Sequence, residues 1–258
     1  MATPAERRYQ RMTAAAMGSD SPIAVHRADN LYEQMLMLLT EHRRALKTIQ
    51  SLDRKLQAKA RMAPEYEAYL AGILDSNSGR QDDVLVTLML WYIDIGTIEK
   101  ALPLAEYALK HNLVMPDRFE RGLACIVAEE VAETAFRLQE TETPITAELL
   151  MRTVALTRDH DMFDEARAKL FKQLGLAQEA AGHLTDAVVS YEVALKLHDK
   201  SGVKKYIERV QRELKKDVQK PAETQPIVTQ EKDPATPPQV APELTEPTTG
   251  EQQNADAS

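Results

Sequence analysis

The strongest constraint on the fold is an apolar run at residues 84–93, VLVTLMLWYI, broken only by one threonine. The run has 10 residues, about half of the ~20 that a membrane-spanning helix needs, so it must be buried in a protein core. An apolar segment without a polar face predicts a helix surrounded by neighbouring helices. Asp82 or Asp83 is expected to cap its positive N-terminal end, and Gly96 to make the turn that follows.

The composition favours helix almost everywhere before residue 218. Glycine is scarce, with 9 in 258 residues, and aromatic residues make up 5%. Residues of high helix propensity such as Ala, Leu, Glu, Lys and Arg are abundant, and no segment has a convincing strand pattern. The sequence therefore predicts an all-α fold. A single cysteine, Cys125, and the lack of an apolar signal or membrane segment predict an intracellular protein of a reducing cytosol.

Residues 1–62 are predicted to form a basic helical arm for DNA binding or oligomerisation, with 11 basic and 6 acidic side chains. Its first helix is signalled by a capping box at Thr3 and Glu6. A heptad seam then runs through Leu31, Met35, Leu38, His42, Ala45, Ile49, Leu52 and Leu56. The seam predicts a long helix with a coiled-coil-like contact, either to another subunit or within the chain. The residues facing away from the seam are candidates for phosphate contacts or simply a solvated face; they are Arg43, Arg44, Lys47, Arg54 and Arg61.

Residues 63–217 are predicted to form a bundle of helical hairpins. The clearest hairpin, residues 170–197, is similar to a tetratricopeptide repeat. Its pattern positions carry Phe171, Leu174, Gly175, Gly182, Ala187, Tyr191 and Ala194, while Gln178 replaces the usual aromatic residue. A weaker copy includes the apolar run and continues with Tyr92, Gly96, Ala101, Ala105 and Ala108. The two turn glycines are 86 residues apart, so the two hairpins are not adjacent repeats.

Charge changes sign twice near the C-terminus. Residues 200–217 carry 7 basic and 3 acidic side chains, and Lys204, Lys205, Arg209 and Arg212 are further candidates for phosphate contacts. Residues 218–258 hold 7 of the 13 prolines, no aromatic residue, and 7 acidic against 2 basic side chains. This composition predicts a disordered acidic tail that serves as a linker, a solubiliser or a tether for a protein partner.

Catalytic motifs are scarce. Without a Gly-Lys dipeptide the chain has no P-loop and is predicted not to be an ATPase. One cysteine and six scattered histidines give no zinc-finger spacing. A hydrolytic Mg²⁺ site would need converging carboxylates. Three clusters could supply them: Asp82 with Asp83; Glu129, Glu130 and Glu133; and Asp159, Asp161, Asp164 and Glu165.

A structural role is the simpler interpretation of each acidic cluster. Adjacent aspartates on a helix point about 100° apart and do not easily chelate one ion. Asp161 and Asp164 fit a cap and a first-turn acid of the following helix, and Glu129 and Glu133 a solvated face. The catalytic candidates are Asp82, Asp83, Asp161 and Asp164, and no metal ligand is assigned.

Six segments, in order, resemble the small terminase subunits of peduovirus-like temperate tailed phages. They are LYEQMLMLL (31–39), QDDVLVTLMLWYIDIG (81–96), ALPLAEYALKHNLVMP (101–116), EEVAETA (129–135), DMFDEARAKL (161–170) and SGVKKYIERVQRELK (201–215). Each is weak alone, but the second and last together make coincidence improbable.

This resemblance implies a role in genome packaging. Such a subunit binds the cohesive-end region of double-stranded phage DNA, forms a homo-oligomer and recruits a large ATPase subunit that drives DNA into the procapsid. The family is also named as the endonuclease subunit of its terminase, so Mg²⁺ would be needed if cleavage occurs in this chain. An autonomous metal-dependent endonuclease and a helical-repeat adaptor that binds only proteins are the alternatives.

Overall fold

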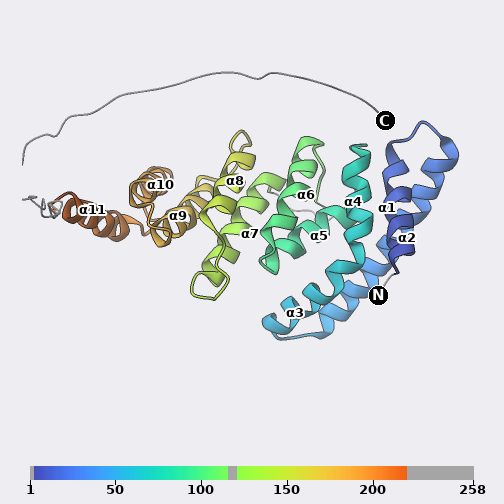
Figure 1. Ribbon diagram of the computed structural model, residues 1–258, viewed down its shortest axis with the longest axis horizontal. Helices are drawn as coiled ribbons and strands as arrows, with labels where there is room; N and C mark the ends of the chain where they lie inside the picture. Colours follow the sequence, from blue (N-terminus) through green and yellow to red (C-terminus); the bar gives the residue numbers. More distant parts are fainter. Residues whose placement is uncertain (1–2, 116–120, 220–258) are drawn as a thin grey trace, which may run out of the picture. The chain divides into compact units, whose positions relative to one another are not determined.

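The computed structural model describes residues 3–115 and 121–219, and within these ranges it contains helices, turns and loops but no strand (Figure 1). The α-helices are α1 (Pro4–Ala15), α2 (Pro22–Thr48), α3 (Leu52–Met62), α4 (Glu67–Ser76), α5 (Asp83–Asp94), α6 (Ile98–Lys110), α7 (Leu123–Leu138), α8 (Ala147–Thr157), α9 (Asp164–Ala180), α10 (Leu184–Leu197) and α11 (Lys204–Gln219). The predicted all-α fold is confirmed. The predicted tail lies outside the described residues, except that residues 218 and 219 belong to α11.

The N-terminal helix forms as its capping box predicts. The backbone N–H of Glu6 donates to Thr3 Oγ1 at 3.2 Å, and the N–H of Thr3 donates to Glu6 Oε2 at 2.6 Å. A 3-10 turn, Ala16–Gly18, follows α1. α1 packs closely on α4, where a Cβ at Gly72 would lie 2.3 Å from the carbonyl oxygen of Arg11. Only glycine lets these two backbones approach so closely.

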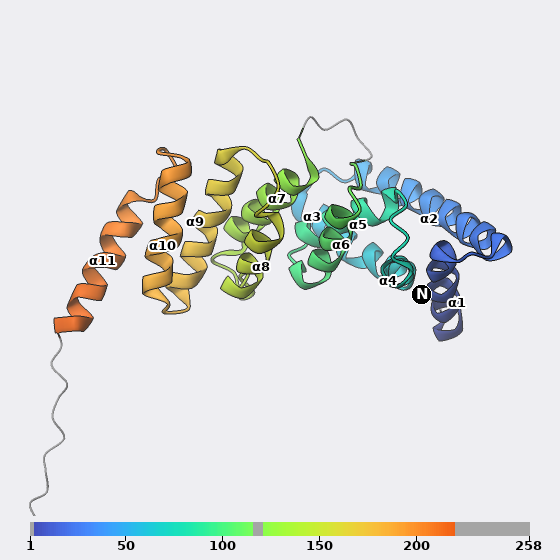
Figure 2. The ribbon, with the colours of Figure 1, turned by 90° about the horizontal axis from the view of Figure 1, so that it is seen from above.

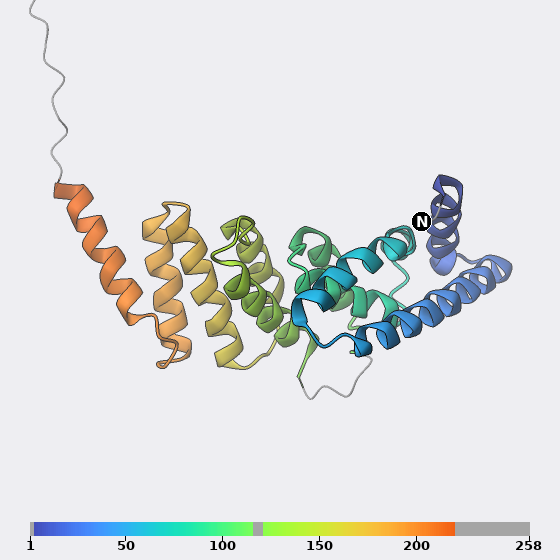
Figure 3. The same cartoon turned by 90° about the horizontal axis from the view of Figure 1, so that it is seen from below.

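The long N-terminal helix is present as α2, but its continuation through Leu56 is wrong (Figure 3). The predicted seam matches the buried face only at Leu31 and Met35; further along, Ala45 is exposed. The buried residues of α2 are Ala28, Leu31, Met35, Leu39 and Leu46, and they pack within the chain. The helix ends at Thr48, and Ser51 starts α3 by accepting a hydrogen bond from the N–H of Arg54 at 3.4 Å. A side-chain cap therefore opens a new helix where the heptad pattern continues.

The apolar run forms the buried helix α5, as predicted. Asp82 is its N-cap, and Val84, Leu85, Val86, Leu88 and Met89 are fully buried. Gly96 makes the following turn with a φ of 82°, a conformation that favours glycine. α5 is the first helix of the α5–α6 hairpin.

Helices α5 to α10 form three successive hairpins (Figure 2). In each pair, α5–α6, α7–α8 and α9–α10, the two helices pack on one another. α7 also packs on α5 and α9, so it joins the first hairpin to the last. The helical-hairpin bundle is thereby built from neighbouring contacts along the chain, as in repeat proteins.

The hairpin α9–α10 is closely packed. A Cβ at Gly175 would lie 2.5 Å from Cε1 of Tyr191, a fully buried ring. Gln178 accepts a hydrogen bond from the hydroxyl of Ser190 at 2.6 Å, so a polar pair stands where the repeat pattern has an aromatic residue. Gly182 makes the turn with a φ of 79°. The predicted hairpin is confirmed.

Two apolar cores lie within this unit. The main core extends from Ala14 to Leu174, and a smaller one is formed by Tyr191, Val203 and Val210 with their neighbours on α9, α10 and α11. Phe171 packs against both cores. The described residues form a single compact unit, and the functional division expected near residue 62 stays a prediction.

Candidate nucleic-acid interface

Four of the five basic residues predicted on the N-terminal arm are exposed to solvent. Arg44 and Lys47 are on α2, and Arg54 and Arg61 are on α3. The two α3 arginines line a groove of about 610 Å³ at the α2–α3 turn, whose walls carry no carboxylate. None of the four makes an ion pair or side-chain hydrogen bond within the described residues. Their charge is therefore available to an anionic partner.

Arg43 has a different environment. Its Nη2 donates a hydrogen bond to Thr87 Oγ1 at 2.7 Å, and Thr87 is buried on α5. This bond anchors α2 on α5. The phosphate contacts proposed below therefore rest on the other four residues of the arm, and the role predicted for Arg43 stays a prediction.

α11 carries the second predicted basic set. Its apolar side, centred on the fully buried Val210, packs on α10. The predicted residues, Lys204, Lys205, Arg209 and Arg212, are exposed. Arg209 is partly engaged, because its Nη2 donates to Glu179 Oε1 at 2.7 Å and its guanidinium lies 5.1 Å from the centroid of the Tyr206 ring.

The two basic sets lie on different parts of the unit. α3 packs on α2 and α5, whereas α11 packs on α10. The structure therefore presents two separate cationic surfaces, the α2–α3 surface (Arg44, Lys47, Arg54 and Arg61) and the α11 surface (Lys204, Lys205, Arg209 and Arg212), and does not bring them into one patch.

Asp82 and Asp83 have structural roles. Asp82 is 3% exposed, accepts from the N–H of Leu85 at 2.8 Å and also accepts from the hydroxyl of Tyr69. Burial raises the pKa of Asp82 above its ordinary value, while these hydrogen bonds oppose the rise. Asp83 accepts from Gln81 Nε2 at 2.8 Å and starts the helix. The interpretation of this pair as a helix cap is confirmed.

Asp161 and Asp164 lie on the exposed surface around the start of α9. Asp164 is in the first turn of the helix, as predicted. The expectation that Asp161 caps the helix is wrong, because the N-cap residue is Phe163, which offers no side-chain hydrogen bond. Phe163 has the extended backbone of an N-cap residue, and the helix starts at Asp164. Asp161 lies two residues before the N-cap position, so its side chain does not cap the helix.

The interpretation of Glu129 as part of a solvated face is also wrong. Its side chain is only 17% exposed; it accepts from Lys169 Nζ at 2.7 Å and pairs with Arg121. Burial acts to raise the pKa of Glu129, but the two cations outweigh it and hold the pKa below its ordinary value. Glu133 is more exposed and lies 3.6 Å from Lys169. Lys169 lies 40 residues from Glu129, so spacing alone could not reveal this pair.

No predicted cluster of acids converges on a point in the described residues. Across 3–115 and 121–219, no group of three or more His, Cys, Asp or Glu side chains is placed to hold one metal ion. Both carboxylate oxygens of Asp82 accept hydrogen bonds, one from the N–H of Leu85 and the other from the hydroxyl of Tyr69. Asp82 thus caps a helix, Asp83 and Asp164 lie in first turns, and Glu129 and Glu133 are in ion pairs.

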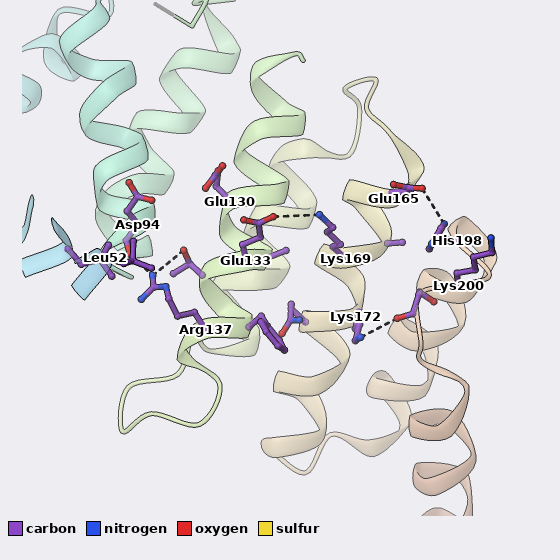
Figure 4. A pocket seen from close by; sticks show the side chains of 17 residues that line it. Leu52, Asp94, Glu130, Glu133, Arg137, Glu165, Lys169, Lys172, His198 and Lys200 are labelled. Atoms are coloured by element: carbon purple, nitrogen blue, oxygen red, sulfur yellow. Dashed lines mark hydrogen bonds and ion pairs between the residues drawn. The ribbon is translucent and has the colours of Figure 1, made fainter. Parts of the chain in front are cut away.

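Sequence analysis missed a groove of about 710 Å³ beside α7 and α9 (Figure 4). It is lined by Asp94, Glu130, Gln173, Lys200 and other residues from distant parts of the chain. The alternating acids and bases of these helices were visible in the sequence. Nothing in the sequence showed that they would face one another.

The comparisons with known proteins agree with this architecture. Residues 36–165 match the family model of the phage small terminase subunit. The chain is 40% identical over 215 residues to the "Terminase, endonuclease subunit" of Escherichia phage P2, covering 83% of this chain and 87% of the relative. It is 27% identical over 204 residues to the "Probable terminase, endonuclease subunit" of Haemophilus phage HP1 (strain HP1c1), covering 73% and 72%.

No solved structure matches this chain. None of the described helices has the length and apolar character needed to cross a membrane. The family model covers half of the sequence, and the first relative covers most of it in both directions. The chain belongs to the family of phage small terminase subunits.

Proposed function

We propose that this chain is the DNA-recognition and assembly subunit of a phage terminase in the host cytoplasm. It binds the cohesive-end region of double-stranded phage DNA and recruits the large ATPase subunit, which cuts the DNA and drives it into procapsids. In this proposal the working form is a homo-oligomer, which brings several copies of each cationic surface to one DNA.

The observation that carries the DNA-binding proposal is the α2–α3 surface. Its four cations are exposed without an acidic partner in the described part of the chain, although the protein as a whole has a net charge of -8. An acidic protein that keeps a local cationic surface repels DNA elsewhere and directs it to that surface. The α11 surface provides additional phosphate contacts.

The test is fluorescence anisotropy of the purified full chain with a labelled cohesive-end duplex and a scrambled duplex, over a salt series containing Mg²⁺. We expect tighter binding to the cohesive-end duplex. The variant Arg44→Gln, Lys47→Gln, Arg54→Gln, Arg61→Gln should bind both duplexes more weakly. If each residue meets one phosphate, the slope of log K against log salt becomes shallower by about 3.6.

Two exposed basic residues of the hairpins provide the matched control. Arg152→Gln with Lys196→Gln removes charge outside both cationic surfaces and should leave the slope unchanged. A loss in this two-charge control of about half that of the four-charge variant would mean that only net charge matters. No binding of either duplex by the wild-type chain would favour the adaptor alternative.

The relatives are named endonuclease subunits, so cleavage is examined in the same samples. We propose that this chain supplies specificity and that cutting requires the large subunit, because Asp82 is occupied as a helix cap. The DNA recovered from the isolated chain in Mg²⁺ should be intact. Cuts that disappear in Asp161→Asn, Asp164→Asn would establish the autonomous endonuclease instead.

A further inference from the structure

Helix α3 has a buried face and an exposed face. On the buried face, Ala58 is 3% exposed, and Lys59 Nζ forms an ion pair with Asp94 at the end of α5. The exposed residues of the opposite face include Arg54, Gln57 and Arg61. Their spacing of three and then four residues places them on one side of the helix. One face therefore fixes α3 on the protein, and the other is presented to solvent.

The exposed face of α3 forms one wall of the groove at the α2–α3 turn, which lies at the lower edge of the helical unit in Figure 1. The other wall consists of residues 48–51, from the end of α2 and the turn. Among the described residues that line this groove, Ile49 is the sole apolar side chain. Asp53, the only acidic residue of α3, lies in the first turn and is not part of the lining. The groove is therefore polar and cationic, which suits a polyanion.

The spacing of the two arginines fits the major groove of DNA. Arg54 and Arg61 are seven positions apart, about 10.5 Å along the helix axis at 1.5 Å per residue. The major groove is about 12 Å wide and admits an α-helix. Two arginines with this separation can each contact a phosphate at one edge of the groove. Gln57, between them on the same face, is then directed toward the edges of the bases.

Gln57 has the chemistry that distinguishes one base pair from another. In the major groove adenine presents an acceptor at N7 and a donor at N6, and a glutamine amide has a donor and an acceptor that match both. Gln57 is exposed, and its side chain takes part in none of the hydrogen bonds formed among the described residues. Arg54 and Arg61 attract phosphates whatever the sequence, whereas a neutral amide adds no such attraction. Contact through Gln57 would therefore change specificity rather than general affinity.

We propose that α3 enters the major groove of the cohesive-end duplex and that Gln57 recognises an adenine there. Its Nε2 donates to N7 of the adenine, and its Oε1 accepts from the N6 amino group. Arg54 and Arg61 hold phosphates on the two sides of the groove, and Arg44 and Lys47 at the end of α2 contact the adjoining backbone. This inference rests on the proposed DNA binding by the α2–α3 surface and adds a residue that gives it sequence specificity.

The first experiment compares the full-length Gln57→Ala variant with wild type by fluorescence anisotropy, on the cohesive-end duplex and a scrambled duplex over a salt series. Alanine favours helix, and the position is exposed, so the fold is retained. We expect the ratio of the two affinities to fall by roughly fivefold or more. The slope of log K against log salt should not change, because no charge is removed. Arg61→Gln should instead weaken both complexes and reduce the slope by about 0.9.

Two other glutamines provide matched controls. Gln34→Ala changes an exposed amide on α2 outside the groove, and Gln50→Ala changes an amide that lines the same groove from the turn. Both variants should keep the wild-type ratio and the wild-type slope.

The second experiment replaces each adenine of the cohesive-end duplex in turn by 7-deazaadenine, which lacks the N7 acceptor but still pairs with thymine. One replacement should weaken binding of the wild type by roughly two- to tenfold, the effect of one lost hydrogen bond. The same replacement should leave the affinity of Gln57→Ala unchanged, because this variant has no amide to lose the contact. Sensitivity at no adenine, or equal sensitivity in wild type and Gln57→Ala, would overturn the proposed contact.

The outcomes separate this inference from the proposed function. If the wild type binds neither duplex, or binds both equally, recognition of the cohesive end fails and this inference fails with it. If the wild type prefers the cohesive-end duplex and Gln57→Ala keeps the full preference, the role of Gln57 is overturned while the proposed function stands. Loss of the preference in Gln50→Ala but not in Gln57→Ala would make the turn the recognition element and would also overturn the role of α3.

Discussion

The capping aspartate of α5 allows a stability change to be worked out from the structure. Asp82→Ala removes the cap from the N–H of Leu85, which costs about 1 kcal/mol. It also leaves the fully buried hydroxyl of Tyr69 without an acceptor, at a cost of about 1–3 kcal/mol. Together the free energy of unfolding should fall by roughly 2–4 kcal/mol. Asp82→Asn keeps an oxygen for Leu85 and a polar neighbour for Tyr69, so its cost should stay below about 1 kcal/mol.

The assay is urea-induced unfolding of the full chain at pH 7, followed by far-ultraviolet circular dichroism. Asp83→Asn is the control, because this neighbour is partly exposed and, among the described residues, its side chain bonds only to Gln81. Its cost should be about 0.5 kcal/mol or less. An alanine variant as stable as wild type, or an asparagine variant as unstable as the alanine variant, would refute the assigned contacts of Asp82.

The pH dependence at Asp82 has a defined sign. In the unfolded chain Asp82 ionises at its ordinary pKa, but burial raises its pKa in the folded chain. The folded state then binds more protons between these two values, so the stability of the wild type falls as pH rises through that window. The asparagine variant does not titrate there. Its stability relative to wild type should therefore increase from pH 4 to pH 7 in the same urea assay.

Three further substitutions test packing and burial. Gly175→Ala places a Cβ 2.5 Å from the buried ring of Tyr191 and should cost about 1–3 kcal/mol in the urea assay; an unchanged midpoint would contradict the close contact. Gly72→Ala pushes against the backbone of Arg11 and should speed amide hydrogen exchange in α1 before it affects α9. Glu130→Gln should raise the melting temperature at pH 7 but not at pH 4. The reason is that burial, and to a smaller extent repulsion from Asp94, raises the pKa of Glu130. An equal rise in melting temperature at pH 4 and pH 7 would mean that the charge of Glu130 is not the cause.

Local signals predicted a large part of the fold. The cap at Asp82, the apolar run that follows it and the turn at Gly96 are within 15 residues, so local sequence signals predict the whole of α5. The α9–α10 hairpin was equally visible, because small residues such as Gly175 and Ala187 recur at fixed positions where helices meet. Short-range propensity and tertiary packing agree in these segments.

The remaining features depend on contacts between distant residues. The heptad pattern continues through the α2–α3 turn, and the sequence alone does not show that the cap at Ser51 starts a new helix there. Arg43 was placed on an open face because its partner Thr87 is 44 residues away. The groove beside α7 and α9 is formed by several elements that lie far apart in the sequence, so no local pattern could show that their side chains face one another.

The small second core determines how α11 responds to a mechanical force. Phe171 is shared by the two cores, and α11 is held mainly by α10 through that small core. Local opening of such a terminal unit requires less free energy than global unfolding. The binding free energy of a partner on the exposed face of α11 is therefore added to the free energy needed to open this unit locally. A pull transmitted through α11 would detach this helix first and leave the three hairpins folded.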